Sequence, residues 1–397
     1  MELEKLRRLF FWCHLVAGVC AGIIILIMSV TGVLLAYQRQ IERWADTRDF
    51  VVTRPAPDAA RLSLETLLAK VREGQTATPT AVTLYEDEAE PATVSFAGGR
   101  SLFVNPYTGE VLGEGSTRVR AFFRTVTDWH RWLGASGESR ATGRALTGAS
   151  NLLFLFIVMS GFYLWWPRKW TRNSLRAVTW FRRTQGARAR DFNWHNVVGF
   201  WSALPLFVVV LSGVVISYTW ASNLVYRVAG EEPPVQQQRG GAPGGAGQQQ
   251  QGAAPVVPLE GLDALVSKAE QQVEGWRSIT LQLPQKQDAP VTFNIDRGNG
   301  GQPQLRSQLT LDRRTGEVVR WEPYSNNTLG RRMRSWMRFA HTGEVYGLVG
   351  QTIAALVSAG GALLVYTGLS LALRRLFAWL SRRRALAAAS VEPSLAE

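Results

Sequence analysis

The sequence predicts a membrane-embedded, all-α four-helix bundle that is built as two parallel repeats and carries two small α+β domains outside the membrane. Four long apolar segments predict the bundle, because about 20 apolar residues suffice to cross a hydrocarbon core of roughly 30 Å. The second half of the chain repeats motifs of the first, which predicts the two repeats. Two long stretches between the apolar segments predict the outer domains.

The four apolar segments run from about Phe10 to Tyr37, Ala145 to Trp166, Trp194 to Trp220, and Tyr346 to Leu373. We assign the regions 1–39, 145–167, 194–221 and 346–373 to these spans. The first span is expected to stay as an anchor. Its apolar run is longer than that of a cleaved signal peptide, and no A-x-A site follows it.

Basic residues predict the orientation of the spans, since Lys and Arg are retained on the cytoplasmic side. They gather before the first span, in the loop 168–193 and in the tail 374–397. Both termini and this loop are therefore expected in the cytoplasm. We attribute the net charge of +13 to this topology and to contact with membrane lipids, in preference to nucleic-acid binding.

The two outer domains are expected at 40–118 and 257–325. Each contains a helical stretch followed by strand-like runs such as TVSFAG and SLFVNP in the first domain, and SITLQL and VTFNID in the second. The segment NPYTGEVLG at 105–113 matches DRRTGEVVR at 312–320. Its Thr-Gly pair predicts a turn between the last two strands of each domain.

The remaining segments connect these domains to the spans. Basic, aromatic, helix-prone stretches at 119–144 and 326–345 predict an interfacial helix before the second and the fourth span. The segment 222–256 is a linker, rich in Gly, Pro and Gln from residue 231 onward. Cys13 and Cys20 lie in the first span and are interpreted as packing residues, so the outer domains fold without disulfides.

The repeat is clearest in the first and third spans. An offset of 181 residues superposes His14 on His195, Gly18 on Gly199, and Thr31-Gly32 on Ser212-Gly213. Because both halves cross the membrane in the same direction, we expect them to be related by an axis along the membrane normal. That symmetry places His14 with His195 near the cytoplasmic face.

His130 and His341 form a second pair by the same symmetry, near the outer face. All four histidines of the chain therefore fall into two facing pairs at membrane boundaries. Facing neutral imidazoles in a helical bundle are typical axial ligands of a six-coordinate b-type haem. We expect two haem groups, with His14 and His195 binding one iron and His130 and His341 the other.

Glycines beside the histidines support this interpretation. Gly18, Gly134 and Gly199 each follow a histidine by four residues, one turn along if the helix continues, and would leave space for a flat macrocycle. His341 departs from the pattern. A lone boundary histidine is more often a hydrogen-bonded packing residue, and small residues often serve helix packing alone. Zinc or copper would recruit other ligands, and a c-type attachment needs a C-x-x-C-H motif that the chain lacks.

The chain resembles the PepSY-associated transmembrane proteins, which include inner-membrane ferric-siderophore reductases of Gram-negative bacteria. The resemblance rests on the H-x3-G openings of two spans, the segments DWHRWLG and RFAHTGEVYG, and the two NPYTGEVLG-like turns. It covers nearly the whole chain except 231–256 and the last ~20 residues. It implies two periplasmic PepSY modules and b-type haem held by histidines that match His14, His130, His195 and His341.

The resemblance further implies that the protein reduces Fe(III) in a periplasmic siderophore for iron acquisition. The two haems would pass electrons from one to the other across the bacterial inner membrane. A ferric chelate would be held beside the outer haem. No catalytic side chain is required. The electron donor would be a separate quinol or cytoplasmic reductase, since the chain lacks G-x-G-x-x-G and its cytoplasmic loop is short. Four aromatic residues are candidates for packing against the outer haem or the chelate, with interfacial anchoring as the alternative, namely Trp129, Trp132, Trp336 and Phe339. Three arginines could pair either with haem propionates or with lipid phosphate, namely Arg131, Arg334 and Arg338.

Two other functions stay open. The PepSY domains could bind or regulate a periplasmic protease or another partner without catalysis, with the spans as anchors only. A transporter or transport accessory is also compatible with parallel repeats. The spans lack the intramembrane Asp, Glu, Lys or Arg that coupled transport usually needs, which argues against transport.

Overall fold

The computed structural model describes residues 2–166, 171–183, 185–234, 258–284, 286 and 288–391. The chain divides into two compact units. A helical unit comprises Met1–Ala36, Phe123–Ser222 and Ala340–Glu397, and a sheet unit comprises Tyr37–Phe122 and Asn223–Phe339. Arg168 and Lys169 of the predicted basic loop, most of the predicted linker and the last six residues lie outside the described residues.

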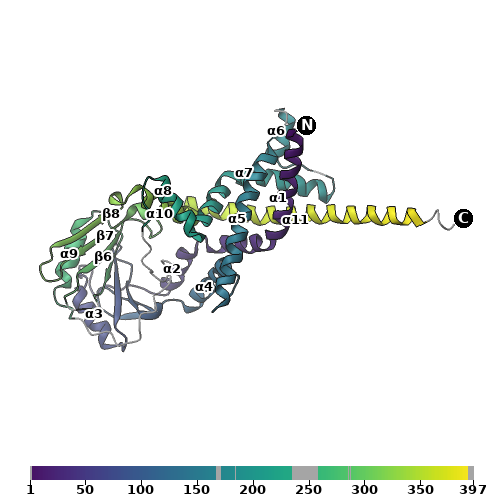
Figure 1. Cartoon of the computed structure of the whole chain (residues 1–397). Helices are drawn as coiled ribbons and strands as arrows, with labels where there is room; N and C mark the ends of the chain where they lie inside the picture. The colour runs from purple at the N-terminus through teal and green to yellow at the C-terminus, as the bar shows by residue number, and fades with distance from the viewer. Residues whose placement is uncertain are drawn as a thin grey trace. The chain divides into compact units, whose positions relative to one another are not determined.

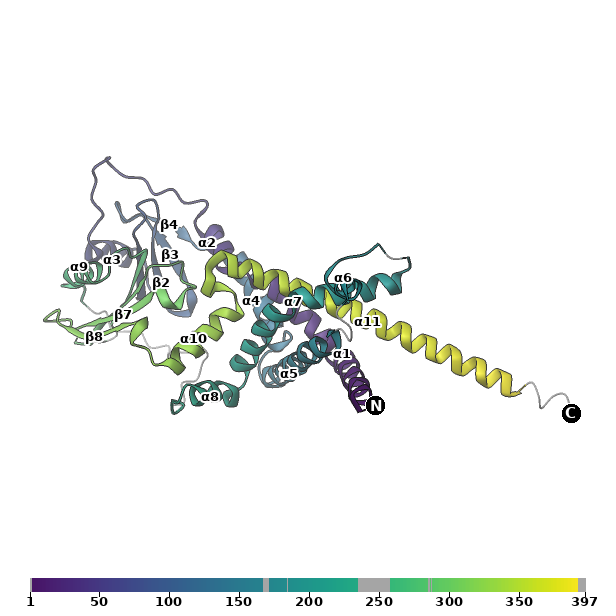
Figure 2. The same ribbon diagram turned by 90° about the horizontal axis from the view of Figure 1, so that it is seen from above.

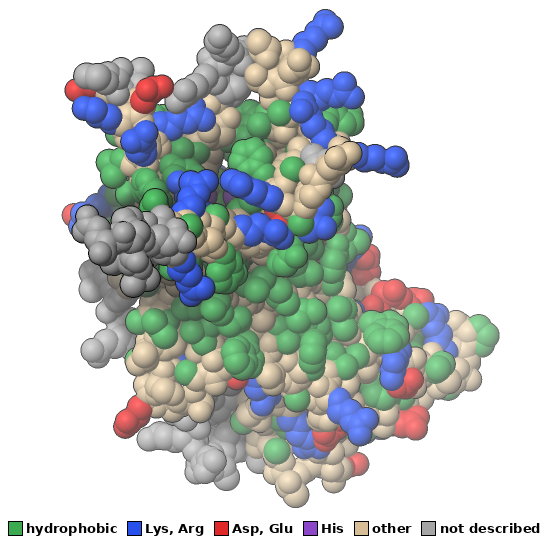
Figure 3. All heavy atoms as spheres, turned by 90° about the vertical axis from the view of Figure 1, so that its right-hand side faces the viewer, with side chains coloured by type: hydrophobic (Ala, Val, Ile, Leu, Met, Phe, Trp, Pro, Cys, Tyr) green, Lys and Arg blue, Asp and Glu red, His purple; other side chains and the backbone are tan. Residues whose placement is uncertain are grey.

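The helical unit contains four helices that are long and apolar enough to cross a membrane: α1 (Glu2–Leu35), α5 (Ser139–Trp165), α7 (Ala187–Ser217) and α11 (Gly347–Val391) (Figure 1). A short helix, α6 (Arg172–Thr179), lies between α5 and α7 in the chain. Large apolar side chains on these helices point outward, among them Ile23, Leu204 and Leu356. On the face shown in Figure 3, hydrophobic side chains form a band beneath gathered Lys and Arg side chains, an arrangement typical of a membrane protein.

The fourth long helix differs from the sequence prediction. Its apolar span was expected to end near Leu373, but α11 continues to Val391. The sequence after Leu373 is rich in Ala, Leu and Arg, which are strong helix formers, and no Pro or Gly occurs before Pro393. The helix therefore extends beyond the apolar segment.

The packing order of the four helices decides where a shared site can lie. α1 packs against α5 and α11, and α7 packs against the same two helices. α1 and α7 are therefore diagonal partners across the bundle. Close approaches use small residues, for instance Gly22 against Leu369 and Gly361 against Ser29. Buried Gln351 donates to the carbonyl of Ala36 at 2.7 Å and so satisfies a backbone group near the end of α1.

The sheet unit contains one eight-stranded antiparallel sheet in the order β4-β3-β2-β1-β5-β6-β7-β8 (Figures 1 and 2). The first half supplies β1 (Pro79–Tyr85), β2 (Ala92–Phe96), β3 (Ser101–Val104) and β4 (Val111–Glu114). The second half supplies β5 (Ser278–Gln282), β6 (Val291–Asp296), β7 (Arg306–Leu311) and β8 (Val318–Pro323). Short 3-10 helices lie at Ala97–Gly99, Pro303–Leu305, Tyr324–Asn326 and Glu344–Tyr346.

Two small outer domains were expected, whereas the structure joins both sets of strands in one sheet. The join is the antiparallel pair β1–β5, in which Thr83 faces Thr280 and their hydroxyls are 2.9 Å apart. Unpaired, these two first strands would each expose a row of backbone groups beside apolar side chains such as Val82 and Ile279. Pairing removes both exposed edges at once.

One face of the sheet is covered by α3 (Leu64–Glu73) and α9 (Leu262–Gln272), which lie side by side (Figure 2). Their apolar residues and the inward side chains of the strands form one continuous core. The two helix starts bind each other, because the backbone N–H of Glu65 donates to the Asp263 carboxylate at 3.2 Å and that of Asp263 donates to Glu65 at 3.3 Å.

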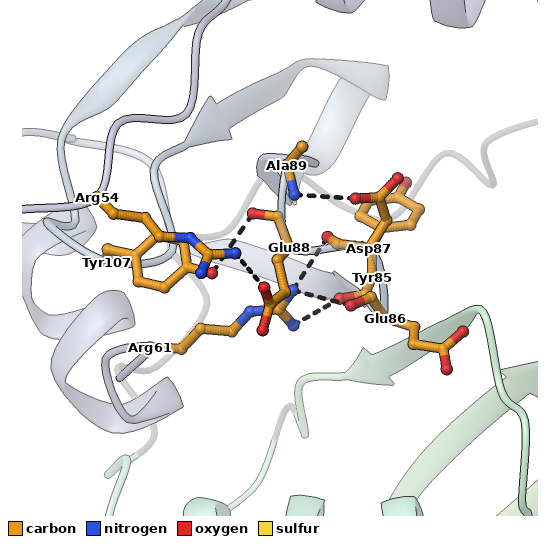
Figure 4. A network of polar contacts seen from close by, with 8 residues as sticks. All are labelled: Arg54, Arg61, Tyr85, Glu86, Asp87, Glu88, Ala89 and Tyr107. Atoms are coloured by element: carbon orange, nitrogen blue, oxygen red, sulfur yellow. Dashed lines mark hydrogen bonds and ion pairs between the residues drawn. The ribbon is translucent and has the colours of Figure 1, made fainter. Parts of the chain in front are cut away.

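The predicted Thr-Gly turns are confirmed between β3 and β4 and between β7 and β8. Gly109 and Gly316 have φ of 74° and 68°, values that favour glycine. The turn between β1 and β2 is held by Arg61, which donates to the carbonyls of Tyr85, Glu86 and Asp87 (Figure 4).

Four further helices connect the sheet strands to the long helices. They are α2 (Gln38–Thr47), α4 (Thr117–Trp132), α8 (Thr219–Val228) and α10 (Leu329–His341). Both α4 and α10 begin at a carboxylate. The backbone N–H of Ser116 donates to Asp46 at 2.6 Å, and that of Gly330 donates to Glu231 at 2.8 Å. These two carboxylates fix the starts of the helices that carry His130 and His341.

Candidate cofactor site

The four histidines form two pairs within the helical unit. His14 on α1 and His195 on α7 line one cavity. His130, in the last turn of α4, and His341, the last residue of α10, have ring centres 6.2 Å apart with planes inclined by 59°. The structure thus brings together the partners that the sequence repeat pairs.

Each histidine places its ring atom Nδ1 within hydrogen-bonding distance of a hydroxyl group. The Nδ1 atoms of His14, His130 and His195 are each 2.9 Å from a hydroxyl oxygen, on Ser160, Thr31 and Thr367 respectively. The Nδ1 atom of His341 is 3.3 Å from the Ser212 hydroxyl and 2.8 Å from the carbonyl oxygen of Val209. All four hydroxyls belong to the long helices.

The hydroxyl hydrogens determine which ring nitrogen carries the proton. A hydroxyl has one hydrogen, and each of these four donates it to a carbonyl one turn back in its own helix. Thr31 donates to Ile27 at 2.6 Å, Ser160 to Ile157 at 3.2 Å, Ser212 to Val209 at 2.8 Å and Thr367 to Leu363 at 2.8 Å. The hydroxyl oxygen can then only accept, so Nδ1–H of the histidine donates. Nε2 is left with its lone pair, the form that binds a metal.

A glycine follows each of these hydroxyl residues and lies against the same histidine ring. A Cβ added at Gly161, Gly213 or Gly368 would lie 3.2–3.4 Å from Cε1 of His14, His341 or His195. At Gly32 it would lie 3.6 Å from Cε1 of His130. Glycine therefore lets the ring pack onto the helix that holds its Nδ1.

The sequence reasoning missed half of this arrangement. It noted Thr31-Gly32 and Ser212-Gly213 only as marks of the repeat, and it passed over Ser160-Gly161 and Thr367-Gly368. A usable signal was present, since every span contains a Ser-Gly or Thr-Gly pair.

The cavity around His14 and His195 has a volume of about 1380 Å³, above the roughly 300–1,000 Å³ of ordinary small-molecule sites. Its walls are apolar and aromatic, with Phe154, Phe162, Trp165 and Phe200 among them. Gly18 and Gly199 line it, and a Cβ added to Gly18 would meet nothing within 4 Å. The described side chains around this pair can accommodate a large, flat, apolar molecule.

Gly134, unlike Gly18 and Gly199, lies past the end of the helix that carries its histidine. α4 ends at Trp132, so the helical turn that would carry Gly134 beside His130 is not formed. Gly134 has φ of 75°, and its backbone N–H donates to the carbonyl of Asp128, which closes the helix end. A Cβ there would meet the ring of Trp129 at 3.1 Å. The residue is needed for the chain turn.

The donor set fits a haem better than a bare metal ion. Among the described residues no cluster of three or more His, Cys, Asp and Glu side chains could hold a metal. Two imidazoles fill only half of a tetrahedral zinc site, whereas a haem brings four nitrogens of its own. Two metal–nitrogen bonds of about 2 Å, plus about 1 Å from each nitrogen to its ring centre, require ring centres about 6 Å apart. His130 and His341 meet that spacing.

His130 of the second pair is also in the protonation state that a haem ligand requires. Burial lowers the pKa of His130 to about 4, and the neighbouring His341 acts in the same direction. The imidazole is therefore neutral at physiological pH, with Nε2 available as a ligand.

A family model described as the PepSY-associated TM region matches residues 11–375 of the chain. The protein belongs to the PepSY-associated transmembrane family. The motif-based prediction of this family is confirmed. A search of the curated proteins found no significant match. With its four candidate membrane spans, this family member is a membrane protein.

The match includes all four histidines and the whole sheet of this PepSY-associated protein. The predicted aromatic and basic neighbours of the second pair have partners of other kinds as well. The guanidinium groups of Arg131 and Arg140 lie over the ring of Trp132, 4.6 and 3.9 Å from its centre. Within the sheet unit, the guanidinium of Arg306 lies 5.5 Å from the ring centre of Phe339. A role for Arg131, Arg334 or Arg338 at a haem stays a prediction.

Proposed function

We propose that this PepSY-associated protein is a haem-b-containing membrane oxidoreductase that reduces ferric siderophores during iron acquisition. The observation that carries the proposal is the fourfold histidine arrangement. Each ring has its Nδ1 atom against a long helix, and the four rings form two pairs.

His14 with His195 and His130 with His341 would be the axial ligands of two haem groups. A haem bound by such a pair would supply one-electron chemistry. The chain's own contribution is to orient the four rings, to fix their tautomer and to surround the first pair with apolar walls that exclude water.

Two helices set the separation of the two sites. Thr31 lies seventeen positions after His14 on α1, and Ser212 lies seventeen positions after His195 on α7. Each helix thus bears a ligand of the first site and the hydrogen-bond acceptor for a ligand of the second, about 25 Å apart along its axis. An apolar cluster of Leu206, Val210 and Val357 lies between them in the helical unit. This span is close to the thickness of a hydrocarbon core.

The proposed reaction transfers one electron to the Fe(III) of a siderophore and yields Fe(II), which the siderophore holds weakly. The electron comes from a separate donor, a quinol or a cytoplasmic reductase. We place the protein in a bacterial inner membrane with both termini in the cytoplasm and the sheet unit in the periplasm. The basic residues at the helix ends support this orientation.

The test is a dithionite-reduced minus oxidised absorption spectrum of the detergent-purified protein, with haem quantified per chain as the pyridine haemochrome. We expect two b-type haems in the wild type and one in either His14→Ala or His130→Ala. Ser202→Ala is the matched control, because this buried serine of α7 donates to the carbonyl of Val198 in its own helix. It should keep both haems. A colourless wild-type protein from haem-supplemented cells would contradict the proposal and would favour a PepSY module that binds a periplasmic partner without catalysis.

A further inference from the structure

The cavity around His14 and His195 has a basic rim that the ligand geometry does not use. Four arginines line it, namely Arg7, Arg8, Arg188 and Arg375. Glu4 is the one acidic residue among the described residues that line this cavity. The excess of positive charge borders walls that are otherwise apolar, so the rim is suited to an anionic group on an apolar ligand.

Two of these arginines hold equivalent positions in the two halves of the chain. Arg7 precedes His14 by seven residues, and Arg188 precedes His195 by seven residues. Seven residues are two helical turns, so each arginine lies on the same helix face as its histidine and about 10 Å along the axis. Because α1 and α7 are diagonal across the bundle, the two arginines stand on opposite sides of the cavity.

Both side chains can take an anionic ligand. Arg7 donates to the carbonyl of Leu164 at 2.5 Å, which leaves other N–H groups of its guanidinium for a ligand. The side chain of Arg188 makes no hydrogen bond or ion pair within the described part of the chain. A guanidinium presents two parallel N–H groups that match the two oxygens of a carboxylate.

We propose that Arg7 and Arg188 form a two-point clamp for the two propionate carboxylates of the haem bound by His14 and His195. This inference rests on the proposed function. It assigns the haem an orientation, with its carboxylate edge toward the amino-terminal ends of α1 and α7. Two carboxylates drawn into an apolar cavity need counter-charges, and the two arginines supply one each.

The other two rim arginines do not fit this role. The residue equivalent to Arg8 in the second half is Ala189, so Arg8 has no partner across the cavity. The guanidinium of Arg375 lies 5.0 and 4.8 Å from the ring centres of Phe11 and Trp12, which hold it over aromatic faces at the rim.

The experiment measures how fast haem leaves the first site. The full chain carries His130→Ala, so that only the first site is occupied, and haem transfer to excess haem-free myoglobin is followed by absorbance. Arg7→Gln, Arg188→Gln and the double variant are compared with Arg8→Gln as the matched control. Each preparation is loaded once with haem and once with its dimethyl ester, in which the carboxylates are blocked.

We expect Arg7→Gln and Arg188→Gln each to release haem about tenfold faster, which corresponds to the loss of one charge-assisted hydrogen-bonded pair. Arg8→Gln should release it at the unchanged rate. The ester should leave the parent protein as fast as haem leaves the double variant, and the Gln substitutions should not accelerate ester release further. Arg188→Gln is the cleaner variant, because Arg7 also binds α5.

Unchanged haem release from Arg188→Gln, or an ester that still distinguishes the variants from the parent, would overturn the clamp. Arginines that bind lipid phosphate would give that result. Equal effects of Arg8→Gln and Arg7→Gln would overturn the pairing of Arg7 with Arg188. If the parent protein holds no haem at all, the proposed function itself fails and the clamp with it. A coloured parent with unaffected variants rejects the clamp alone.

Discussion

The two histidine pairs are built from different parts of the chain, and this difference decides what each needs in order to form. His14 and His195 lie inside the long helices α1 and α7, and their acceptors Ser160 and Thr367 lie on α5 and α11. His130 and His341 lie at the carboxyl ends of the shorter helices α4 and α10. The first pair therefore requires only the four long helices, whereas the second also requires two helices that begin in the sheet unit.

The helices α1 and α7 have two roles. They carry the histidines of the first pair, and they carry the hydroxyl groups that accept hydrogen bonds from the histidines of the second pair. α5 and α11 supply acceptors to the first pair alone. A change on α1 or α7 can reach both sites, and a change on α4 or α10 should reach one.

The largest expected effect separates the two pairs by function. We expect His130→Ala or His341→Ala to reduce electron transfer to a ferric siderophore at least about 100-fold, while the haem at His14 and His195 keeps its spectrum. The reason is that these variants remove an axial ligand from the second site and leave the four long helices intact. The measurement is dithionite- or quinol-driven formation of Fe(II), trapped with a ferrous chelator, in proteoliposomes. Full activity in either variant would show that the second pair is not on the electron path.

A second prediction concerns the two glycines that lie against the histidine rings of the second pair, Gly213 beside His341 and Gly32 beside His130. A Cβ at Gly213 would lie 2.8 Å from Nδ2 of Asn151 and 3.2 Å from the ring of His341, whereas a Cβ at Gly32 would meet its neighbours at 3.5–3.6 Å. Gly213→Ala should therefore displace the His341 ring and destabilise the fold by about 1–3 kcal/mol. Gly32→Ala should be neutral, since ordinary contact adds no strain and Ala favours a helix. Haem content after mild heating checks both, and equal losses would contradict the crowding argument.

The sequence could predict the spans and the pairing, because apolar length and the spacing of His14 and His195 are local patterns. The alignment at an offset of 181 did not pair Ser160 with Thr367, which match at 207 like the segments 105–113 and 312–320, although a Ser-Gly or Thr-Gly pair in every span was there to be noticed. The sequence also suggested that Gly134 lies one helical turn after His130, although the helix ends before it and the chain turns there. The single sheet depends on contacts such as Thr83 with Thr280, which are distant in sequence and follow only from the need to cover both strand edges.

A third prediction tests the dependence of the second pair on helix starts in the sheet unit. Asp46 is buried, accepts the backbone N–H of Ser116 and pairs with Arg120 at 2.6 Å. Asp46→Ala removes these bonds at the start of α4 and should destabilise it by about 1–3 kcal/mol. In a thermal scan, the haem at His130 and His341 should be lost at a lower temperature than in the wild type, and the haem at His14 and His195 should not. Exposed Asp49, paired with neighbouring Arg48, provides the control Asp49→Ala. Loss of both haems together would show that the sites do not form independently.

The smallest expected effect is the change in haem reduction potential when a hydroxyl group that accepts from Nδ1–H is removed. An acceptor on Nδ1–H makes Nε2 a stronger donor and favours ferric iron, so Ser160→Ala should raise the reduction potential of the first haem by roughly 20–60 mV, equivalent to one hydrogen bond. The effect stays small because the carbonyl of Ile157 is also within hydrogen-bonding reach of His14. The matched control is Ser202→Ala, a buried serine on α7 that donates to the carbonyl of Val198.

Ser212→Ala should change the potential of the second haem less than Ser160→Ala changes that of the first. The Nδ1 atom of His341 is already closer to the Val209 carbonyl than to the Ser212 hydroxyl, at 2.8 against 3.3 Å, so the carbonyl can keep the proton on Nδ1 without the serine. Spectroelectrochemical titration of the two haems measures both shifts. A larger shift for Ser212→Ala would mean that the hydroxyl, not the carbonyl, governs the His341 ring, and the contrast between the two pairs at this level would disappear.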